Sequence, residues 1–289
     1  IDPDISVEEL RNMGTHTLYK DAPRVLLPGD MVYDSDLIPY RSVRELFEHG
    51  LENVDFINGA DDGEAEVFAE SVSGLNEVPV RKFINGIRSS MDFYAHYRNL
   101  LGTLYDKYDF GNLVKVTDEN AWDMARFLAN RGLCGSEGMN VSRNLMLNRY
   151  FGMYMRERHP GNHCYSYLWT HQLPCPQEDK GTPLDPANTL AWHSTELWFT
   201  FASLREGIPP HRPWREIDYR LADIISTYWA NFIKTGNPNE EGLPWWPESG
   251  ADYGYMELGD TCSGHQGIDG ELEQLILEFV RAEYKLEER

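Results

Sequence analysis

The chain has 289 residues, of which 41% are hydrophobic, and this is enough to bury a substantial core. Its 26 basic and 47 acidic side chains give a net charge of −21, which repels nucleic acid and anionic membrane surfaces, so we expect neither as a partner. No apolar run approaches the roughly 20 residues of a spanning helix, and residues 1–4 lack the pattern of a signal peptide. We therefore expect a soluble chain, with the cytoplasm slightly favoured over export.

The first half of the chain contains loop, helix and strand patterns. Residues 1–41 are broken by prolines and turn residues and predict a loop-rich segment. Ser42 and Glu45 form a capping box, so we expect a short helix that ends at Gly50. Residues 53–59 alternate in part, end in glycine and predict a strand that delivers the next loop to a surface site.

Residues 79–159 have mostly helical spacing of apolar side chains. Within this region, residues 145–155 are rich in methionine and predict a helix that packs in an ordinary core, because methionine fills irregular gaps. A lining role beside a pocket is the second interpretation of this stripe.

The second half of the chain continues the alternation of strands and helices. Residues 163–171 are aromatic, alternate in polarity and predict a strand inside a sheet. An amphipathic helix is expected over residues 215–233, a strand over 253–258 and a final helix over 271–285. Strands that alternate with helices predict an α/β layer fold.

One histidine has the surroundings of a catalytic group. His193 lies in residues 191–201 between small and aromatic residues, and a strongly apolar run follows it. Histidine can accept and return a proton near neutral pH, so it suits acyl transfer as general base and then general acid. The alternative interpretation is a histidine packed in the core beside tryptophan and leucine.

The cysteines and the other histidines give weaker patterns. Four cysteines in 289 residues are too few for a disulfide scaffold, and their redox state leaves the compartment open: Cys134, Cys164, Cys175 and Cys262. A Cys164–Cys175 disulfide is plausible if the protein is exported. A metal site could be drawn from His163, Cys164, His171 and Cys175, but the spacing matches no common zinc pattern, so we expect no metal and no cofactor.

Four motifs, distributed along most of the chain, now point to one family. They are residues 32–39, residues 59–68 (Gly-Ala-Asp-Asp-Gly-Glu-Ala-Glu-Val-Phe), the histidine segment 191–201, and residues 228–239 (Tyr-Trp-Ala-Asn-Phe-Ile-Lys-Thr-Gly-Asn-Pro-Asn). Together they resemble the type B carboxylesterases and cholinesterases of the α/β-hydrolase superfamily. The resemblance covers essentially the whole chain as the C-terminal half of such an enzyme, and the last motif is long and specific.

The resemblance implies two members of a catalytic triad. Glu64 matches the acid and His193 the base, and the order of acid then histidine is that of this superfamily. Gly63 stands where the family usually has Asp, and Ala65 where it has Gly, so a shifted alignment would nominate Asp62 instead. A simpler interpretation of this acidic run is a solvated charged turn.

The nucleophile is missing from the pattern. No Gly-x-Ser-x-Gly occurs, and the nearest string, residues 134–138, lacks the first glycine. In the resembled family the serine and the oxyanion-hole glycines precede the position of Ile1. The resemblance therefore implies a partner, an N-terminal polypeptide that carries the nucleophilic serine.

The resemblance thus implies a fold and a function. We expect residues 1–289 to be the C-terminal part of a single α/β-hydrolase domain, a mostly parallel sheet flanked by helices, with a helical pocket-shaping region around residues 80–160 over the catalytic edge. The implied activity is hydrolysis of a small carboxylic ester through an acyl-serine intermediate. Two alternatives are a catalytically silent adhesion or binding homologue, as in neuroligin-like proteins, and an inactive fragment. The sequence identifies neither the ester nor the oligomeric state.

Overall fold

The computed structural model describes residues 5–13, 39–40, 45–63, 86–134, 145–182, 185–207, 211–250 and 252–284. It falls into two units, residues 1–50 and 51–289, and each is described by itself. The expectation of a single domain over residues 1–289 stays a prediction. In the described part of the chain, no helix is both long enough and apolar enough to cross a membrane.

The first unit contains helix α1 (Val7–Asn12) and the π-helix η1 (Leu46–Gly50). The loop prediction for residues 1–41 is wrong at α1, where Ser6 and Glu9 form a capping box: the Glu9 amide donates to the Ser6 hydroxyl over 3.2 Å and the Ser6 amide donates to the Glu9 carboxylate over 2.9 Å. The capping residue Ser42 and the motif at residues 32–38 lie outside the described residues.

The second unit is built around a four-stranded sheet in the order β1-β2-β3-β4. Strands β1 (Phe56–Asp61), β2 (Cys164–Trp169) and β3 (Tyr255–Leu258) are parallel, and β4 (Cys262–His265) pairs antiparallel with β3. The predicted mostly parallel sheet is confirmed, as is the interior position of the aromatic strand β2. Strand β4 was not predicted, because its four residues lack an alternation of apolar and polar side chains.

Strand β1 begins and ends later than the pattern predicts. Gly59 was expected to end the strand, but it lies inside β1, and the strand continues to Asp61. The reason is a close approach, because a Cβ atom at Gly59 would overlap the ring of Tyr167 on the neighbouring strand. The extra residues bring the acidic run up to the end of the sheet.

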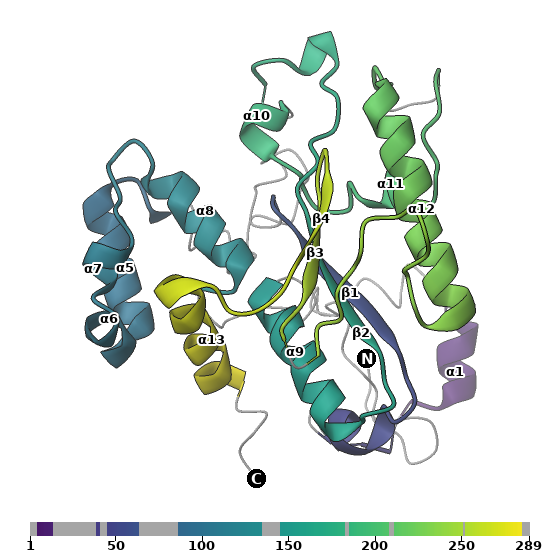
Figure 1. Ribbon diagram of the computed structural model, residues 1–289, viewed down its shortest axis with the longest axis horizontal. Helices are drawn as coiled ribbons and strands as arrows, with labels where there is room; N and C mark the ends of the chain where they lie inside the picture. Colours follow the sequence, from purple (N-terminus) through teal and green to yellow (C-terminus); the bar gives the residue numbers. More distant parts are fainter. Residues whose placement is uncertain are drawn as a thin grey trace. The chain divides into compact units, whose positions relative to one another are not determined.

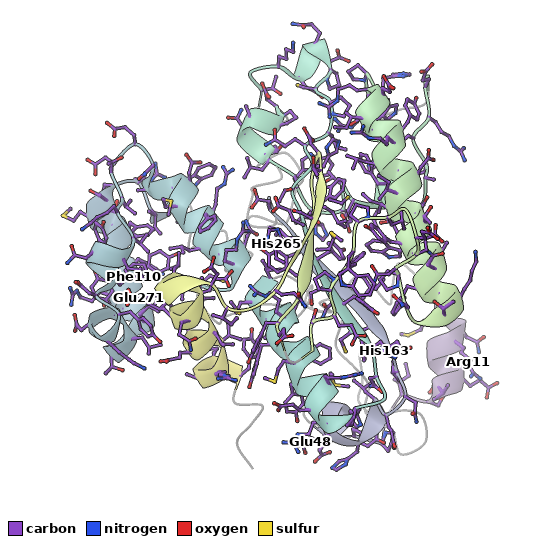
Figure 2. The ribbon with its side chains drawn as sticks, viewed as in Figure 1. Arg11, Glu48, Phe110, His163, His265 and Glu271 are labelled. Atoms are coloured by element: carbon purple, nitrogen blue, oxygen red, sulfur yellow. The ribbon has the colours of Figure 1, made fainter. Side chains whose placement is uncertain are left out.

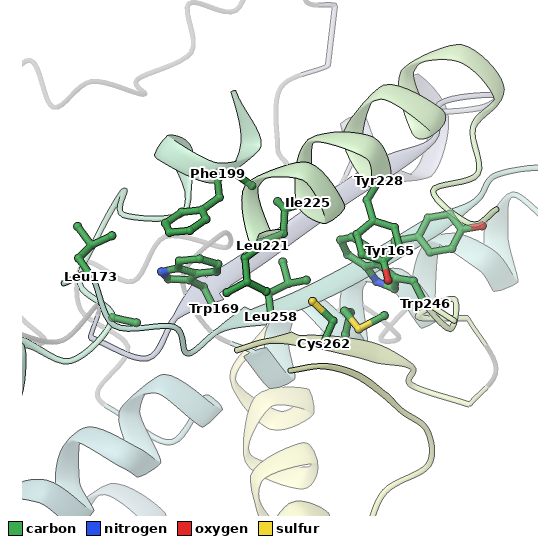
Figure 3. Packing of buried hydrophobic residues seen from close by; sticks show 13 residues of the cluster. Tyr165, Trp169, Leu173, Phe199, Leu221, Ile225, Tyr228, Trp246, Leu258 and Cys262 are labelled. Atoms are coloured by element: carbon green, nitrogen blue, oxygen red, sulfur yellow. The ribbon is translucent and has the colours of Figure 1, made fainter. Parts of the chain in front are cut away.

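Two long helices cover the two faces of the sheet (Figure 1). Helix α12 (Glu216–Thr235) packs against aromatic side chains of β2, with Leu221, Ile225 and Tyr228 in one buried cluster with Trp169 (Figure 3). Helix α9 (Leu145–Arg158) covers the other face, where its Leu145 joins a second cluster with Ala60 and Leu168. Both predicted helices are confirmed, and the methionine-rich stripe of α9 is buried as ordinary core.

The other described helices of the second unit include five that are only three to five residues long. The described part of residues 80–160 is largely helical before α9, as predicted, and contains α5 (Ser90–Leu101), α6 (Thr103–Lys107), α7 (Phe110–Leu113) and α8 (Ala121–Arg131). An aromatic cluster of Phe93, Tyr97, Tyr105 and Phe110 joins α5, α6 and α7. Figure 2 labels Phe110 of this cluster. Three short helical turns follow β2: η3 (Gln177–Asp179), α10 (Pro186–Thr189) and α11 (Leu197–Thr200). The final helix, α13 (Gly270–Tyr284), is close to its predicted bounds.

Candidate active site

The histidine segment is joined to the carboxyl end of β1. The backbone N–H of Gly63 donates to the carbonyl of Ala191 over 2.7 Å, and Gly63 forms an isolated parallel β-bridge with Trp192. One residue earlier, the N–H of Asp62 donates to the carbonyl of Trp169 at the end of β2 over 2.9 Å. The structure thus brings the acid-loop backbone and the histidine segment together, although they are distant in sequence.

Gly63 is required at this bridge by the closeness of the two backbones. A Cβ atom at this position would meet backbone atoms of Thr189, Ala191 and Trp192. Backbone atoms cannot rotate away as a flexible side chain can, so any side chain here would push the two segments apart. The glycine that seemed a departure from the family pattern therefore has a packing role.

The residue after His193 is held by the last residue of β1. The N–H of Ser194 donates to the carboxylate of Asp61 over 2.9 Å, and Ser194 has a φ of 69°, in the left-handed region. Asp61 is only 2% exposed, so this charge-assisted hydrogen bond lies away from bulk water. The interpretation of the acidic run as a solvated turn is wrong for Asp61.

The next residue, Thr195, ties the same segment to the end of β2. Its side chain is fully buried, accepts a hydrogen bond from the indole N–H of Trp169 over 2.8 Å and donates one to the carbonyl of Trp192 over 2.7 Å. The backbone on both sides of His193 is therefore fixed by two adjacent strand ends. His193 itself is exposed, so the alternative of a histidine packed in the core is wrong.

The structure describes only one of the two candidate acids. Glu64 lies outside the described residues. Asp62 is described: its carboxylate lies 3.5 Å from the Arg131 guanidinium, and its carbonyl accepts a hydrogen bond from the Asn130 side chain over 2.6 Å. Both partners belong to α8, so the end of this helix lies against the acid loop.

Asp61, Gly63, Thr195 and Trp169 had no assigned role in the sequence analysis. Asp61 was named only within the charged run, and Thr195 and Trp169 only within their segments. Their common signal is position, because each lies at a strand end or beside the histidine, but the partner of each lies far away along the chain. The Ser194–Asp61 bond spans 133 positions.

The weaker constellation of histidines and cysteines does not form one site. All four cysteines carry free thiols, so the Cys164–Cys175 disulfide considered for an exported chain is absent. His163 lies 2.9 Å from Glu248, whereas His171 is bonded to Asp218 and Asp260. Within the ranges that the structure describes, no three side chains of the metal-ligating kind gather.

Burial also removes two of the thiols from consideration as nucleophiles. Burial, together with nearby carboxylates, raises the pKa of Cys134 and of Cys164 to about 12. At neutral pH both therefore stay in the unreactive thiol form.

Comparisons with known proteins agree on one family. A family model described as "Carboxylesterase family" matches residues 5–274. Carboxylesterase 1C of Mus musculus is 37% identical over 81 residues, which is 27% of this chain and 14% of that protein. Carboxylesterase 1F of Mus musculus is 33% identical over 92 residues (31% and 15%), and liver carboxylesterase 1 of Oryctolagus cuniculus is 34% identical over 85 residues (29% and 14%). The matched segments thus span about a seventh of the length of these relatives.

Proposed function

Because the chain belongs to the carboxylesterase family, and so to the α/β-hydrolase fold, we propose that it supplies His193 and Glu64 to a Ser-His-Glu triad that hydrolyses carboxylic esters. The observation that carries this proposal is the parallel bridge between Gly63 and Trp192. Glu64 and His193 directly follow these two bridged residues in the sequence, and this adjacency supports their assignment to one pair.

His193 would act as the proton carrier. It accepts the proton of the attacking serine hydroxyl as the serine oxygen bonds to the ester carbonyl carbon. The resulting imidazolium then donates this proton to the leaving alcohol, which leaves an acyl-serine. A water molecule, deprotonated by the same histidine, hydrolyses the acyl-serine and regenerates the free enzyme. The exposure of His193 in this chain supports such a role, because a proton carrier must reach its substrate.

Glu64 would orient the imidazole and stabilise its charged form. A carboxylate that accepts a hydrogen bond from one ring nitrogen leaves the other nitrogen free to face the serine. The ion pair of Asp62 with Arg131 favours Glu64 over Asp62 for this role, because the side chain of Asp62 is already directed toward α8.

The serine and the oxyanion hole would come from a polypeptide N-terminal to this chain. The sequence of 289 residues has no Gly-x-Ser-x-Gly, so a complete triad requires another segment. The substrate is accordingly a small ester whose acyl carbon lies between that serine and His193.

Hydrolysis of p-nitrophenyl butyrate by the intact protein, purified with any polypeptide that accompanies this chain, tests the proposal. His193→Ala should lower kcat/KM by about 10³-fold or more, and Glu64→Gln by about 10²-fold or more. Two matched controls, His163→Ala and Asp62→Asn, should retain most of the activity, because each removes an ionisable group outside the triad.

Three results would contradict the proposal. An unchanged rate in His193→Ala would show that His193 is not the base. A larger loss of activity in Asp62→Asn than in Glu64→Gln would show that Asp62 is the acid. Failure of the intact protein to hydrolyse any short ester would favour a silent binding homologue. Mass spectrometry of the same preparation should find Gly-x-Ser-x-Gly in the polypeptide chain or chains present.

A further inference from the structure

A second histidine of this unit is buried in a cluster of charges beside the proposed site. His171 is 1% exposed and follows the end of β2. Its Nδ1 lies 2.6 Å from a carboxylate oxygen of Asp260, and its Nε2 lies 2.7 Å from a carboxylate oxygen of Asp218. The two carboxylate partners of His171 come from different parts of the fold: Asp218 is in the first turn of α12, and Asp260 lies between β3 and β4.

These two distances are evidence for the protonation state of the ring. An ionised carboxylate only accepts hydrogen bonds, so each ring nitrogen at this distance from one must carry a proton. A neutral imidazole has one bare nitrogen, which would place two acceptors at hydrogen-bond distance from each other. The geometry therefore favours the doubly protonated, positively charged imidazolium.

Arg215 offers a competing arrangement. Its Nη2 lies 3.3 Å from His171 Nε2, so a bare Nε2 could accept a hydrogen bond from the guanidinium. The same Nη2, however, donates to the Asp218 oxygen over 2.8 Å, and His171 Nε2 lies closer to that oxygen than to Arg215. Both cations thus converge on Asp218.

Asp218 has the charge that this arrangement needs. Burial alone would raise the pKa of its carboxyl group, but hydrogen bonds from the Arg215 side chain and backbone and from His171 lower this pKa below its usual value. With Asp260 as the second carboxylate, two negative and two positive groups face one another. The cluster is neutral only when His171 is charged.

The ring of His171 supports the two side chains that carry the histidine segment. Its centroid lies 5.5 Å from the Trp169 ring and 5.2 Å from the Phe199 ring, and Figure 3 shows Phe199 beside Trp169. Trp169 donates to Thr195, and Phe199 belongs to α11, which begins four residues after His193. A shift of His171 would therefore reach His193 through both contacts.

We propose that His171, held as an imidazolium between Asp218 and Asp260, is a positioning residue for His193. This inference rests on the proposed function only for its kinetic consequence, since the charge state of the ring is argued from its contacts with Asp218 and Asp260 and is tested without substrate. Its role is to lock the end of β2 to the start of α12, and thereby to fix Trp169 and Phe199 beneath the segment that carries the base.

Nitrogen-15 NMR of histidine-labelled intact protein tests the charge state without any substrate. At pH 7.5 the His171 ring, assigned by its loss in His171→Gln, should show two protonated nitrogens. A ring with one bare nitrogen would overturn the proposal. His163, just before the start of β2 (Figure 2), is the internal reference, because its ring has a single carboxylate partner, Glu248, at 2.9 Å.

Kinetics and the His193 signal test the positioning role. His171→Gln should lower kcat about tenfold and leave KM within about twofold, because a displaced base slows the chemical step more than binding. The His193 ring signal should move in the same variant, and His163→Gln should change neither quantity. Unchanged kcat together with an unmoved His193 signal would overturn the positioning role.

A surface pair of variants covers the case in which His171→Gln does not fold. The Asp260 side chain is 71% exposed, so both Asp260→Asn and Asp260→Glu should fold. The first removes one negative partner and should lower kcat and move the His193 signal, whereas the second keeps the charge and should restore both. Equal behaviour of the two variants would contradict the proposal. If the wild-type protein hydrolyses no ester, the proposed function fails, and the two NMR signals still decide the role of His171.

Discussion

Thr195→Val removes the single hydroxyl that links the histidine segment to β2. Valine has nearly the shape of threonine but lacks the hydroxyl, so the variant removes the hydrogen bonds of this fully buried position without opening a large cavity. The Trp169 indole N–H loses its acceptor at 2.8 Å. The Trp192 carbonyl loses one donor but keeps the backbone N–H of Thr195 at 3.1 Å. One buried group is therefore left without a hydrogen bond.

The size of the effect follows from this count. Leaving one buried polar group unsatisfied costs about 1–3 kcal/mol, so the free energy of unfolding should fall by this amount. Thr195→Ser keeps the hydroxyl and loses one methyl group, which should cost about 1 kcal/mol. In the double variant Trp169→Phe/Thr195→Val neither partner remains, so its loss should be smaller than the sum of the two single losses.

Urea unfolding of the intact protein, followed by circular dichroism, measures these differences. We expect Thr195→Val to be the less stable single variant at position 195, with a lower kcat because the backbone beside His193 loosens. If Thr195→Val is as stable as the wild type, or if Thr195→Ser is the less stable of the two, the hydrogen bond does not hold the segment. Strict additivity in the double variant would lead to the same conclusion.

Three further predictions concern backbone approach, pH and thiol burial. Gly63→Ala should abolish esterase activity, because the new Cβ would meet the backbone of Thr189 and Ala191, whereas Gly161→Ala, where no atom lies within 4 Å, should be tolerated. The pKa of Asp218 is lowered in the folded protein, so its contribution to stability is present above the pKa of an unfolded aspartate, about 4. This contribution should be lost as the pH falls through the pKa of the folded state. Asp218→Asn should therefore flatten the decline in stability at acid pH, measured by urea titrations. Iodoacetamide at pH 8 should modify Cys134 and Cys164 only after unfolding, since burial raises the pKa of both thiols to about 12. Peptide mass spectrometry measures this labelling. Rapid labelling of either thiol in the native protein would show that it is not buried.

Much of the fold was predictable because its signals are local. The apolar spacing of α9, α12 and α13 and the aromatic alternation of β2 each follow from residues that are neighbours in sequence. Helix α1 was missed although its capping box, Ser6 with Glu9, is equally local. The shift of β1 could not be predicted, because it depends on the ring of Tyr167 on another strand.

The site was predictable only where a motif was present. His193 was found from its own segment, and Glu64 from the resemblance of residues 59–68 to the acid-bearing motif of the family. The hydrogen bonds of Asp61 and Trp169 to the histidine segment join residues that are far apart along the chain, so no local pattern contains them. His171 was considered only as a metal ligand, since its two carboxylate partners become neighbours only when α12 and the β3–β4 turn meet the end of β2.

Labelling of the intact protein with a fluorophosphonate probe tests the central claim most directly, because this reagent phosphonylates only a serine whose proton a neighbouring base removes. The account predicts that peptide mass spectrometry finds the label on the serine of a Gly-x-Ser-x-Gly outside residues 1–289, and that His193→Ala abolishes the labelling while His163→Ala does not. A label on a serine within residues 1–289, or labelling that survives His193→Ala, would contradict the account.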